Sequence, residues 1–256
     1  MILSESPRIE ILQGRCEDLI KLIPDASIDL LLQDTPFGVT KNSWDIKPDL
    51  KLMWREWERI AKPAAAFIFF ATQPFASELI MSNLDMFRYD IIWKKTGKPT
   101  GFLNAKRMPL RAHEHILVFY KKLPTFNPQK TIGKPFHPRG KGAGKNNVNN
   151  NYGEFDQTSQ PVPSNEKFPI SVIEFSQPHP PLHPTQKPLD MIRYLIRAYS
   201  NEGDNIFDGY SGSGTSFIAS FLEKRNCIVY EMKQEYIDIS IDRLKKIVSI
   251  PKLDLK

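Results

Sequence analysis

Short apolar runs alternate with longer amphipathic segments along most of the chain. Continuous apolar runs, such as 30–32 and 67–70, are typical of strands covered on both faces, as in parallel sheets. Seven strands are predicted on this basis, at 9–12, 28–33, 66–71, 89–93, 115–120, 206–208 and 227–230. Helical periodicity predicts helices at 50–62, 75–84, 189–200, 216–224 and 234–248. Strands separated by helices of this length indicate an α/β fold with a doubly wound, mostly parallel seven-stranded sheet.

Residues 123–175 break this alternation. They contain seven prolines, an Asn-rich tract at 146–151 and a Gly/Lys tract at 140–145. A structureless loop of this length inside a compact domain is uncommon unless it is functional or disordered. We therefore expect an insertion that a partner orders, placed between two halves of one α/β domain at 1–122 and 176–256.

The composition is that of a globular protein, with 256 residues, 41% hydrophobic and 25% charged. The longest apolar run, 64–71, is far too short for a membrane span, and the first residues show no secretory signal. Cys16 and Cys227 can form neither a disulfide framework nor a four-cysteine zinc site. We expect reduced, mostly buried thiols in a cytoplasmic protein with no membrane contact.

The net charge of +6 is concentrated in one stretch of the chain. Residues 93–145 hold thirteen Lys and Arg against a single acid, Glu114, so this stretch carries +12 and the rest −6. Aromatic residues are interleaved with these basic side chains, a mixture that can follow phosphates and offer stacking surfaces. The charge pattern therefore favours a polyanionic partner, with nucleic acid first.

A glycine-rich motif, Asp208-Gly-Tyr-Ser-Gly-Ser-Gly-Thr215, joins a predicted strand to a predicted helix. Gly212 and Gly214 allow a ligand to approach the backbone, and the start of the helix offers free amide donors. Glu231 ends the following strand, where an acid in a nucleoside-binding βαβ unit accepts hydrogen bonds from ribose hydroxyls. The combination favours nucleoside binding over a purely structural turn.

Two further motifs stand at predicted element boundaries. Asp34-Thr-Pro-Phe37 follows a buried strand, and open α/β sheets bind ligands at the carboxyl ends of their strands. By itself this tetrapeptide is better explained as a capped turn. His183-Pro-Thr-Gln-Lys-Pro188 leads into the helix at 189–200 and, taken alone, is equally compatible with a rigid helix cap.

In this order the three motifs resemble those of the S-adenosylmethionine-dependent DNA amino-methyltransferases, which methylate adenine N6 or cytosine N4. The chain is most similar to the permuted, beta-type group, whose catalytic motif precedes the cofactor motif, and the resemblance covers roughly 9–122 and 176–248. It implies a Rossmann-like methyltransferase fold and double-stranded DNA with a flipped target base as substrate. The implied catalytic residues are Asp34, Thr35, Pro36 and Phe37. The implied residues for S-adenosyl-L-methionine are Asp208, Tyr210, Gly212, Ser213, Gly214, Thr215, Glu231, Thr185 and Lys187.

Three positions depart from the family pattern. Thr35 replaces the first Pro of the catalytic motif, where only the backbone carbonyl is used. Gly209 replaces a Pro in the cofactor motif. Arg15 stands where the family usually has an acid near the cofactor adenine, and a guanidinium cannot accept a hydrogen bond.

The resemblance assigns a chemical role to the catalytic motif. The lone pair of an exocyclic base amine is delocalised into the ring, so hydrogen bonds to Asp34 and to the Thr35 carbonyl would localise it on nitrogen. Phe37 would stack on the flipped base. This chemistry needs no metal, and we expect His113 and His115 to be structural. Asp34 favours adenine, since cytosine enzymes of the family more often have Ser there.

The resemblance also implies that the basic region around 93–111 and the insertion at 123–175 recognise the target DNA. The residues expected to contact DNA are Lys94, Lys95, Lys106, Arg107, Arg111, Lys141 and Lys145. The resemblance further implies a bacterial or phage-encoded protein, with a homodimer and a cognate restriction endonuclease as possible partners.

Four alternatives remain open at this point. The first is methylation of cytosine N4 by the same fold, and the second is a glutamine-N5 methyltransferase, against which the motif order argues. The third is a DNA-binding relative that has lost catalysis, for which the departures at Arg15, Thr35 and Gly209 would be the signs. The fourth is a nicotinamide oxidoreductase, but the glycine turn lies too near the C-terminus for a following substrate domain.

Overall fold

A computed structural model describes residues 1–38, 46–97, 99–134, 165–182 and 185–249. The chain forms two compact units, one of Met1–Asn127 with Ser171–Lys256 and one of Pro128–Ile170. The second unit falls inside the expected insertion and starts and ends five residues within its predicted bounds. In its described part, β7 (Thr131–Ile132) pairs antiparallel with β8 (Glu166–Lys167).

The first unit contains a nine-stranded sheet with the order β1-β2-β11-β10-β3-β4-β6-β5-β9. The strands are β1 (Ile2–Glu5), β2 (Arg8–Gln13), β3 (Ile28–Gln33), β4 (Ala61–Ala71), β5 (Phe87–Lys95), β6 (His113–Phe119), β9 (Val172–Phe175), β10 (Asn205–Asp208) and β11 (Asn226–Glu231). All seven predicted strands are present, and β1 and β9 extend the sheet at its two edges. Both additions are four residues long and include charged side chains, so they lack the apolar runs that identified the others.

The centre of the sheet is parallel, as predicted. β3 pairs in parallel with β10 on one side and with β4 on the other, while β11 pairs in parallel with β10 and β2. β6 runs antiparallel to β4 and β5, which brings the start of β6 and the end of β5 to the edge where β3 and β4 end. Residues 34, 95, 113 and 208 therefore lie along one edge of the sheet.

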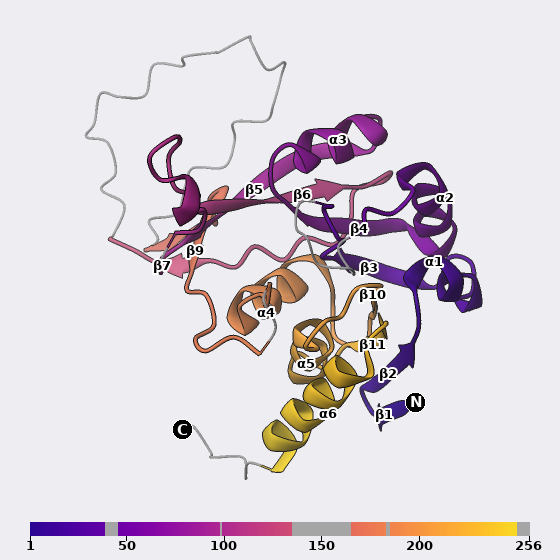
Figure 1. Ribbon diagram of the computed structural model, residues 1–256. Helices are drawn as coiled ribbons and strands as arrows, with labels where there is room; N and C mark the ends of the chain where they lie inside the picture. Colours follow the sequence, from indigo (N-terminus) through magenta and orange to yellow (C-terminus); the bar gives the residue numbers. More distant parts are fainter. Residues whose placement is uncertain (39–45, 98, 135–164, 183–184, 250–256) are drawn as a thin grey trace, which may run out of the picture. The chain divides into compact units, whose positions relative to one another are not determined.

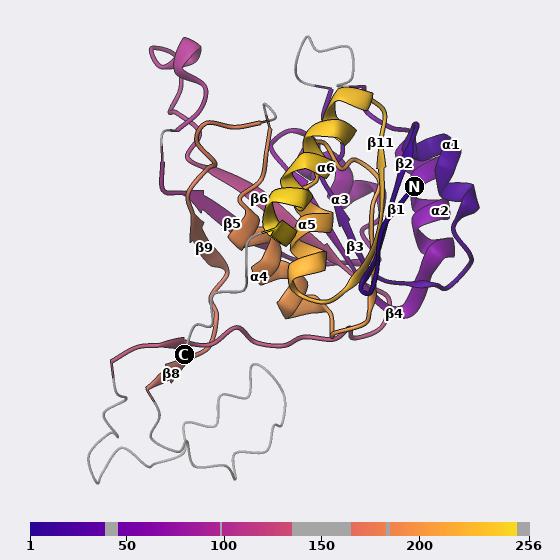
Figure 2. The same ribbon diagram turned by 90° about the horizontal axis from the view of Figure 1, so that it is seen from below.

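Helices cover both faces, which confirms the doubly wound arrangement (Figure 1). The helices on one face are α1 (Cys16–Leu19), α2 (Leu50–Ile60) and α3 (Phe75–Ser82). Those on the other are α4 (Leu189–Tyr199), α5 (Thr215–Leu222) and α6 (Gln234–Ser249). Figure 2 shows the same arrangement from a second direction. Short 3-10 turns follow α1, at Ile20–Leu22, and β5, at Phe102–Asn104.

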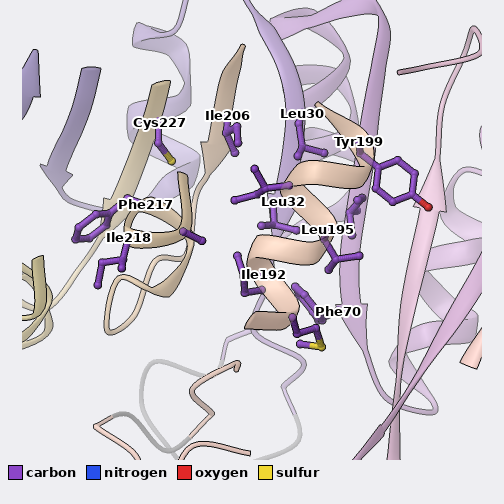
Figure 3. Close-up of a cluster of buried hydrophobic side chains, with 14 of the residues drawn as sticks. Leu30, Leu32, Phe70, Ile192, Leu195, Tyr199, Ile206, Phe217, Ile218 and Cys227 are labelled. Carbon is purple, nitrogen blue, oxygen red and sulfur yellow. The ribbon is translucent and has the colours of Figure 1, made fainter. Parts of the chain in front are cut away.

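The apolar stripe of α4 anchors it on the sheet. Ile192 and Leu195 are buried against the strands, in the same cluster as Leu30, Leu32 and Phe70 (Figure 3). Pro188 occupies the N-cap position with an extended backbone, so the residues before it leave the helix directly toward the sheet edge. The helix thereby fixes the position of Lys187 at that edge.

Cys16 and Cys227 are free and buried, as expected. Among the described residues no helix is long and apolar enough to cross a membrane.

Candidate active site

A cavity of about 360 Å³ opens at the carboxyl edge of the sheet. Its lining brings together most of the residues that the motifs predicted, although they come from three distant parts of the sequence. The predicted residues that line it are Asp34, Thr35, Pro36, Phe37, Lys95, Arg111, Thr185, Lys187, Asp208, Tyr210, Gly212, Ser213, Thr215 and Glu231. Gly214 does not line it but shapes the turn that does.

The glycine turn is fastened to the end of β11 through Glu231. The backbone amide of Gly212 donates to Glu231 Oε2 over 2.8 Å, and that of Lys233 donates to Oε1 over 2.9 Å. Gly212 and Gly214 have φ values of 52° and 80°, a region that favours glycine. At Gly214 a Cβ would also lie 2.4 Å from Phe217 and 2.5 Å from Ser240. Burial raises the pKa of Glu231, and the two amides oppose that rise.

Asp208 supports the turn from the end of β10. It is buried, accepts a hydrogen bond from the Ser216 hydroxyl through Oδ2 and another from the Tyr210 amide through Oδ1, at 2.9 Å. Its hydrogen-bond donors are neutral, and burial raises its pKa from 3.8 to about 7. Asp208 thus ties the start of α5 to the strand.

Gln33, which the sequence reasoning missed, connects the two motif-bearing strands. It is completely buried; its Nε2 donates to the Phe207 carbonyl over 2.7 Å, and its Oε1 accepts from the Gly209 amide over 3.1 Å. A proline at 209 would have no amide to donate. A Cβ at that position would also lie 2.3 Å from Cys16 Sγ. Glycine at position 209 therefore provides an amide that Gln33 binds and leaves the space that Cys16 occupies, and proline would do neither.

The catalytic-motif carboxylate is ion-paired. Lys187 Nζ lies 2.7 Å from Asp34 Oδ2, and the side chain of Lys187 is 8% exposed while that of Asp34 is 23% exposed. The resemblance had implied a role for Lys187 at the cofactor. In the structure its ammonium contacts the catalytic motif, because Pro188 and α4 hold it over β3 and β4, with the Phe70 ring centroid 5.1 Å from the ammonium. Its role at the cofactor stays a prediction.

The ion pair continues into a buried chain of alternating charges. Glu114 Oε2 lies 3.6 Å from Lys187 Nζ, and Glu114 Oε1 lies 2.6 Å from Lys95 Nζ. Lys95 had been expected to face DNA phosphate, but its side chain is only 4% exposed and stacks over Trp93. In the sequence, Glu114 stands out only as the single acid of the basic stretch. Its neighbours on β6 do not signal that it pairs with Lys95 and Lys187, because the pairing of β6 with β4 and β5 brings these groups together.

The pKa values in this chain of charges shift in different directions. Burial raises the pKa of Asp34, and the ammonium of Lys187 opposes the rise. Burial alone would also raise the pKa of Glu114, but the ammonium groups of Lys187 and Lys95 outweigh burial, so the pKa is lowered. Burial alone would lower the pKa of Lys187, but the carboxylates of Asp34 and Glu114 outweigh burial, so the pKa is raised. The shifts therefore favour the charged forms of Lys187 and Glu114 and the protonated form of Asp34.

Two buried aliphatic hydroxyls in the cavity wall have no hydrogen-bond partner within the described part of the chain. They are Thr35 Oγ1 and Ser211 Oγ. Buried polar atoms are normally satisfied, so both indicate where a polar ligand or water would bind. Phe37 lines the same cavity and stacks on Phe75, with ring centroids 5.3 Å apart and an interplanar angle of 26°.

The cavity lining also includes the position where the family pattern has an acid. Arg15 is about half exposed, and its Nε lies 3.6 Å from Glu17 Oε2. Glu17 lines the cavity as well, so a carboxylate is present two residues after the departure.

The remaining predicted DNA contacts divide into two groups. Lys94, Lys106, Arg107 and Arg111 are exposed, and Lys94 pairs with Glu174 at 2.8 Å. Lys141 and Lys145 lie outside the described residues, as does His183 of the third motif.

No cluster of metal-ligating side chains occurs within the described residues. His115 Nδ1 lies 3.0 Å from Asp90, in the neighbouring strand.

The sequence of this chain matches a known protein family. A family model described as DNA methylase, of the N6/N4 type, matches residues 28–242 and so includes all three motifs. The chain belongs to the N6/N4 DNA methylase family. The two alternatives outside DNA methylation, a glutamine methyltransferase and a nicotinamide oxidoreductase, are thereby set aside.

Relatives within this family match nearly the whole chain. Type II methyltransferase M1.MboII of Moraxella bovis is 29% identical over 88% of this chain and 92% of its own length. The DNA adenine methyltransferase YhdJ of Escherichia coli is 28% identical over 91% of this chain and 82% of its own length.

Solved structures share the fold. The M1.HpyAVI–SAM complex superposes with a TM-score of 0.60 at 21% identity, covering 92% of this chain and 99% of that one. The cytosine-N4-specific PvuII DNA methyltransferase superposes with a TM-score of 0.64 at 16% identity, covering 93% and 90%. This agreement confirms the methyltransferase fold and does not separate adenine from cytosine.

Proposed function

We propose that this protein transfers a methyl group from S-adenosyl-L-methionine to the exocyclic N6 of adenine in double-stranded DNA. The observation that carries the proposal is the shared cavity: the Asp34 carboxylate lines the same space as the glycine turn and Glu231. Membership of the N6/N4 DNA methylase family supports DNA as the substrate. An Asp at position 34, and a relative named as an adenine methyltransferase, support adenine.

The cavity wall fits the cofactor. Gly212 and Gly214 carry no side chains that would obstruct a ligand's approach to the backbone, and the hydroxyl of Ser211 offers a partner to a polar ligand. The Glu231 oxygens each accept one backbone amide and have a second lone pair for a ribose hydroxyl. When bound, the cofactor supplies an electrophilic methyl group on a sulfonium sulfur.

Asp34 acts on the target amine. Lys187 binds Oδ2, and we assign Oδ1 as the acceptor for one amine hydrogen, with the Thr35 carbonyl accepting the other. These two hydrogen bonds draw the nitrogen toward tetrahedral geometry, and the carboxylate stabilises the positive charge that develops on it. The chain of Lys187, Glu114 and Lys95 orients this carboxylate, and the ammonium of Lys187 opposes the rise in its pKa that burial causes.

Phe37 and the exposed basic side chains bind the DNA. The target atom cannot be reached inside a duplex, so the base is flipped, and the ring of Phe37 is available to stack on it. Exposed Lys106, Arg107 and Arg111 bind phosphates, and the region at 123–175 reads the target sequence.

The proposal is tested by expressing the protein in a host that lacks DNA methylation and sequencing single molecules of the host DNA. Methylated adenine in one sequence context is the expected result. N4-methylcytosine would instead favour cytosine as the substrate. No modified base, together with no incorporation of labelled methyl groups by the purified protein, would favour the DNA-binding relative.

A further inference from the structure

The loop between β5 and β6 carries exposed apolar side chains that none of the motifs includes. Phe102 is 79% exposed and Leu103 is 99% exposed, in the 3-10 turn Phe102–Asn104, and Met108 is 56% exposed. Large apolar side chains are costly to present together to water, so a cluster of them marks a contact surface.

The loop is built to hold these side chains out. Thr100 and Arg111 exchange two backbone hydrogen bonds of 2.9 Å that close its base. Beyond them, Gly101 takes a φ of 89°, and the Asn104 carbonyl accepts from the amides of Arg107 and Met108 at 2.8 and 3.0 Å. The turn is therefore a hydrogen-bonded platform.

The platform stands beside the candidate active site. Thr100 and Arg111, which pair where the loop leaves the sheet, line the cavity that contains Asp34. Strand pairing accounts for this position, since Lys94 pairs with His113 at the sheet edge where β3 ends. Figure 2 shows the loop projecting beyond the ends of β5 and β6.

The charge around the apolar tip suits a polyanion. Lys106, Arg107 and Arg111 follow the tip and are exposed, and residues 96–113 include no acid. None of the three forms an ion pair among the described residues. A tip of bare apolar side chains with basic residues behind it matches a base stack bordered by phosphates better than it matches a protein surface.

We propose that Leu103, supported by Phe102, is the wedge that enters the DNA duplex where the target base leaves the stack. The inference rests on the proposed function, since it names the residue that helps to expose the base to Asp34. An apolar side chain inserted between base steps replaces the lost stacking contacts and keeps the flipped base from returning. Lys106, Arg107 and Arg111 hold the adjacent phosphates.

The experiment compares wild type with Leu103→Ala on two duplexes that contain the target adenine, one fully paired and one with an abasic position opposite the target. Leu103→Ala should slow methyl transfer at least about tenfold on the paired duplex and less than about twofold on the other, where the base is already unpaired. Leu22→Ala is the matched control: Leu22 is 65% exposed and does not line the cavity, so its loss should change neither rate.

A second measurement does not depend on methyl transfer. Wild type should bind a duplex with one abasic position several-fold more tightly than the intact duplex, because the wedge then displaces no stacked base, and Leu103→Ala should lose that preference. If Leu103→Ala slowed methyl transfer equally on both duplexes, the wedge would be overturned. A dimeric wild type with a monomeric Leu103→Ala variant would then show that the loop joins two copies of the chain. A wild type inactive on both DNAs would refute the proposed function, while the binding preference would still decide the wedge.

Discussion

Two carboxylates stand at neighbouring strand ends on the same edge of the sheet, and their surroundings differ. Asp34 follows β3 and pairs with the ammonium of Lys187 at 2.7 Å. Asp208 ends β10 and accepts hydrogen bonds from a hydroxyl and a backbone amide, both of them neutral. Burial opposes ionisation at both sites, but only Asp34 has a charged partner to offset it.

The difference indicates what each carboxylate is for. A carboxylate that must accept hydrogen bonds from a base amine needs to stay ionised in a partly desolvated cavity, and the chain of Lys187, Glu114 and Lys95 provides the balancing charge. Asp208 ties Ser216 and Tyr210 to the strand and so shapes the glycine turn. Hydrogen bonds from neutral donors are sufficient for that role.

The largest expected effect comes from removing the ammonium that distinguishes the two sites. Lys187→Met leaves Asp34 and Glu114 without their shared partner, and breaking a buried ion pair in this way costs about 3–5 kcal/mol in the free energy of unfolding. Urea denaturation measures it. The control is Lys94→Met, which removes an ion pair of similar length whose two side chains are more than half exposed, and should cost about 0–1 kcal/mol. Similar losses in both variants would show that burial does not distinguish the two pairs.

The second effect concerns catalysis. Asp34→Asn keeps the size of the side chain but removes the charge, so methyl transfer should fall at least about a hundredfold while the cofactor still binds. Incorporation of labelled methyl groups into unmethylated DNA and calorimetric titration with the cofactor measure the two properties. Asp29→Asn makes the same change on β3 but at the strand's other end, where Asp29 pairs with Lys62. That control should methylate at nearly the wild-type rate, and equal rates in all three proteins would remove Asp34 from the mechanism.

The third effect tests the fit around the glycine turn. Gly209→Ala places a Cβ 2.3 Å from Cys16 Sγ, and overpacking of this kind costs about 1–3 kcal/mol. Adding Cys16→Ala should restore part of that loss, because the contacting sulfur is gone. Gly97→Ala is the control, since a Cβ there meets no atom within 4 Å. If the double variant were no more stable than Gly209→Ala, the proposed fit between Gly209 and Cys16 would be wrong.

The smallest effect, counted per pH unit, is a pH dependence at Asp208. Its folded-state pKa of about 7 exceeds the ordinary 3.8, so the folded protein holds this proton more tightly than the unfolded chain. The resulting stabilisation is fully present below about pH 4 and is lost as the pH rises through about 7. The free energy of unfolding of wild type, relative to Asp208→Asn, should fall across this window by at most about 1.4 kcal/mol per pH unit. Parallel pH curves for the two proteins would contradict the raised pKa.

Local patterns in the sequence determined most of the fold. The seven apolar runs and the amphipathic stripes are short-range properties, so they predicted the central strands, the five longer helices and the doubly wound sheet. The strands missed in the sheet of the first unit, β1 and β9, are held mainly by pairing at the sheet edges, which leaves little trace in a four-residue segment. β9 lies within 123–175, which is why the second unit ends before the expected insertion does.

Residues of all three motifs line one cavity, because each motif has its own sequence signature and each stands at the same sheet edge. The partners of the catalytic carboxylate had no such signature. Lys187 and Glu114 are 73 residues apart in the chain, and Glu114 reaches the neighbourhood of Asp34 only because β6 runs antiparallel to β4. Lys95 was predicted at the DNA surface from its charge, and only the tertiary structure showed it buried beside Glu114. The sequence shows which residues are charged, but whether a charged side chain faces water or another charge depends on which strands pair.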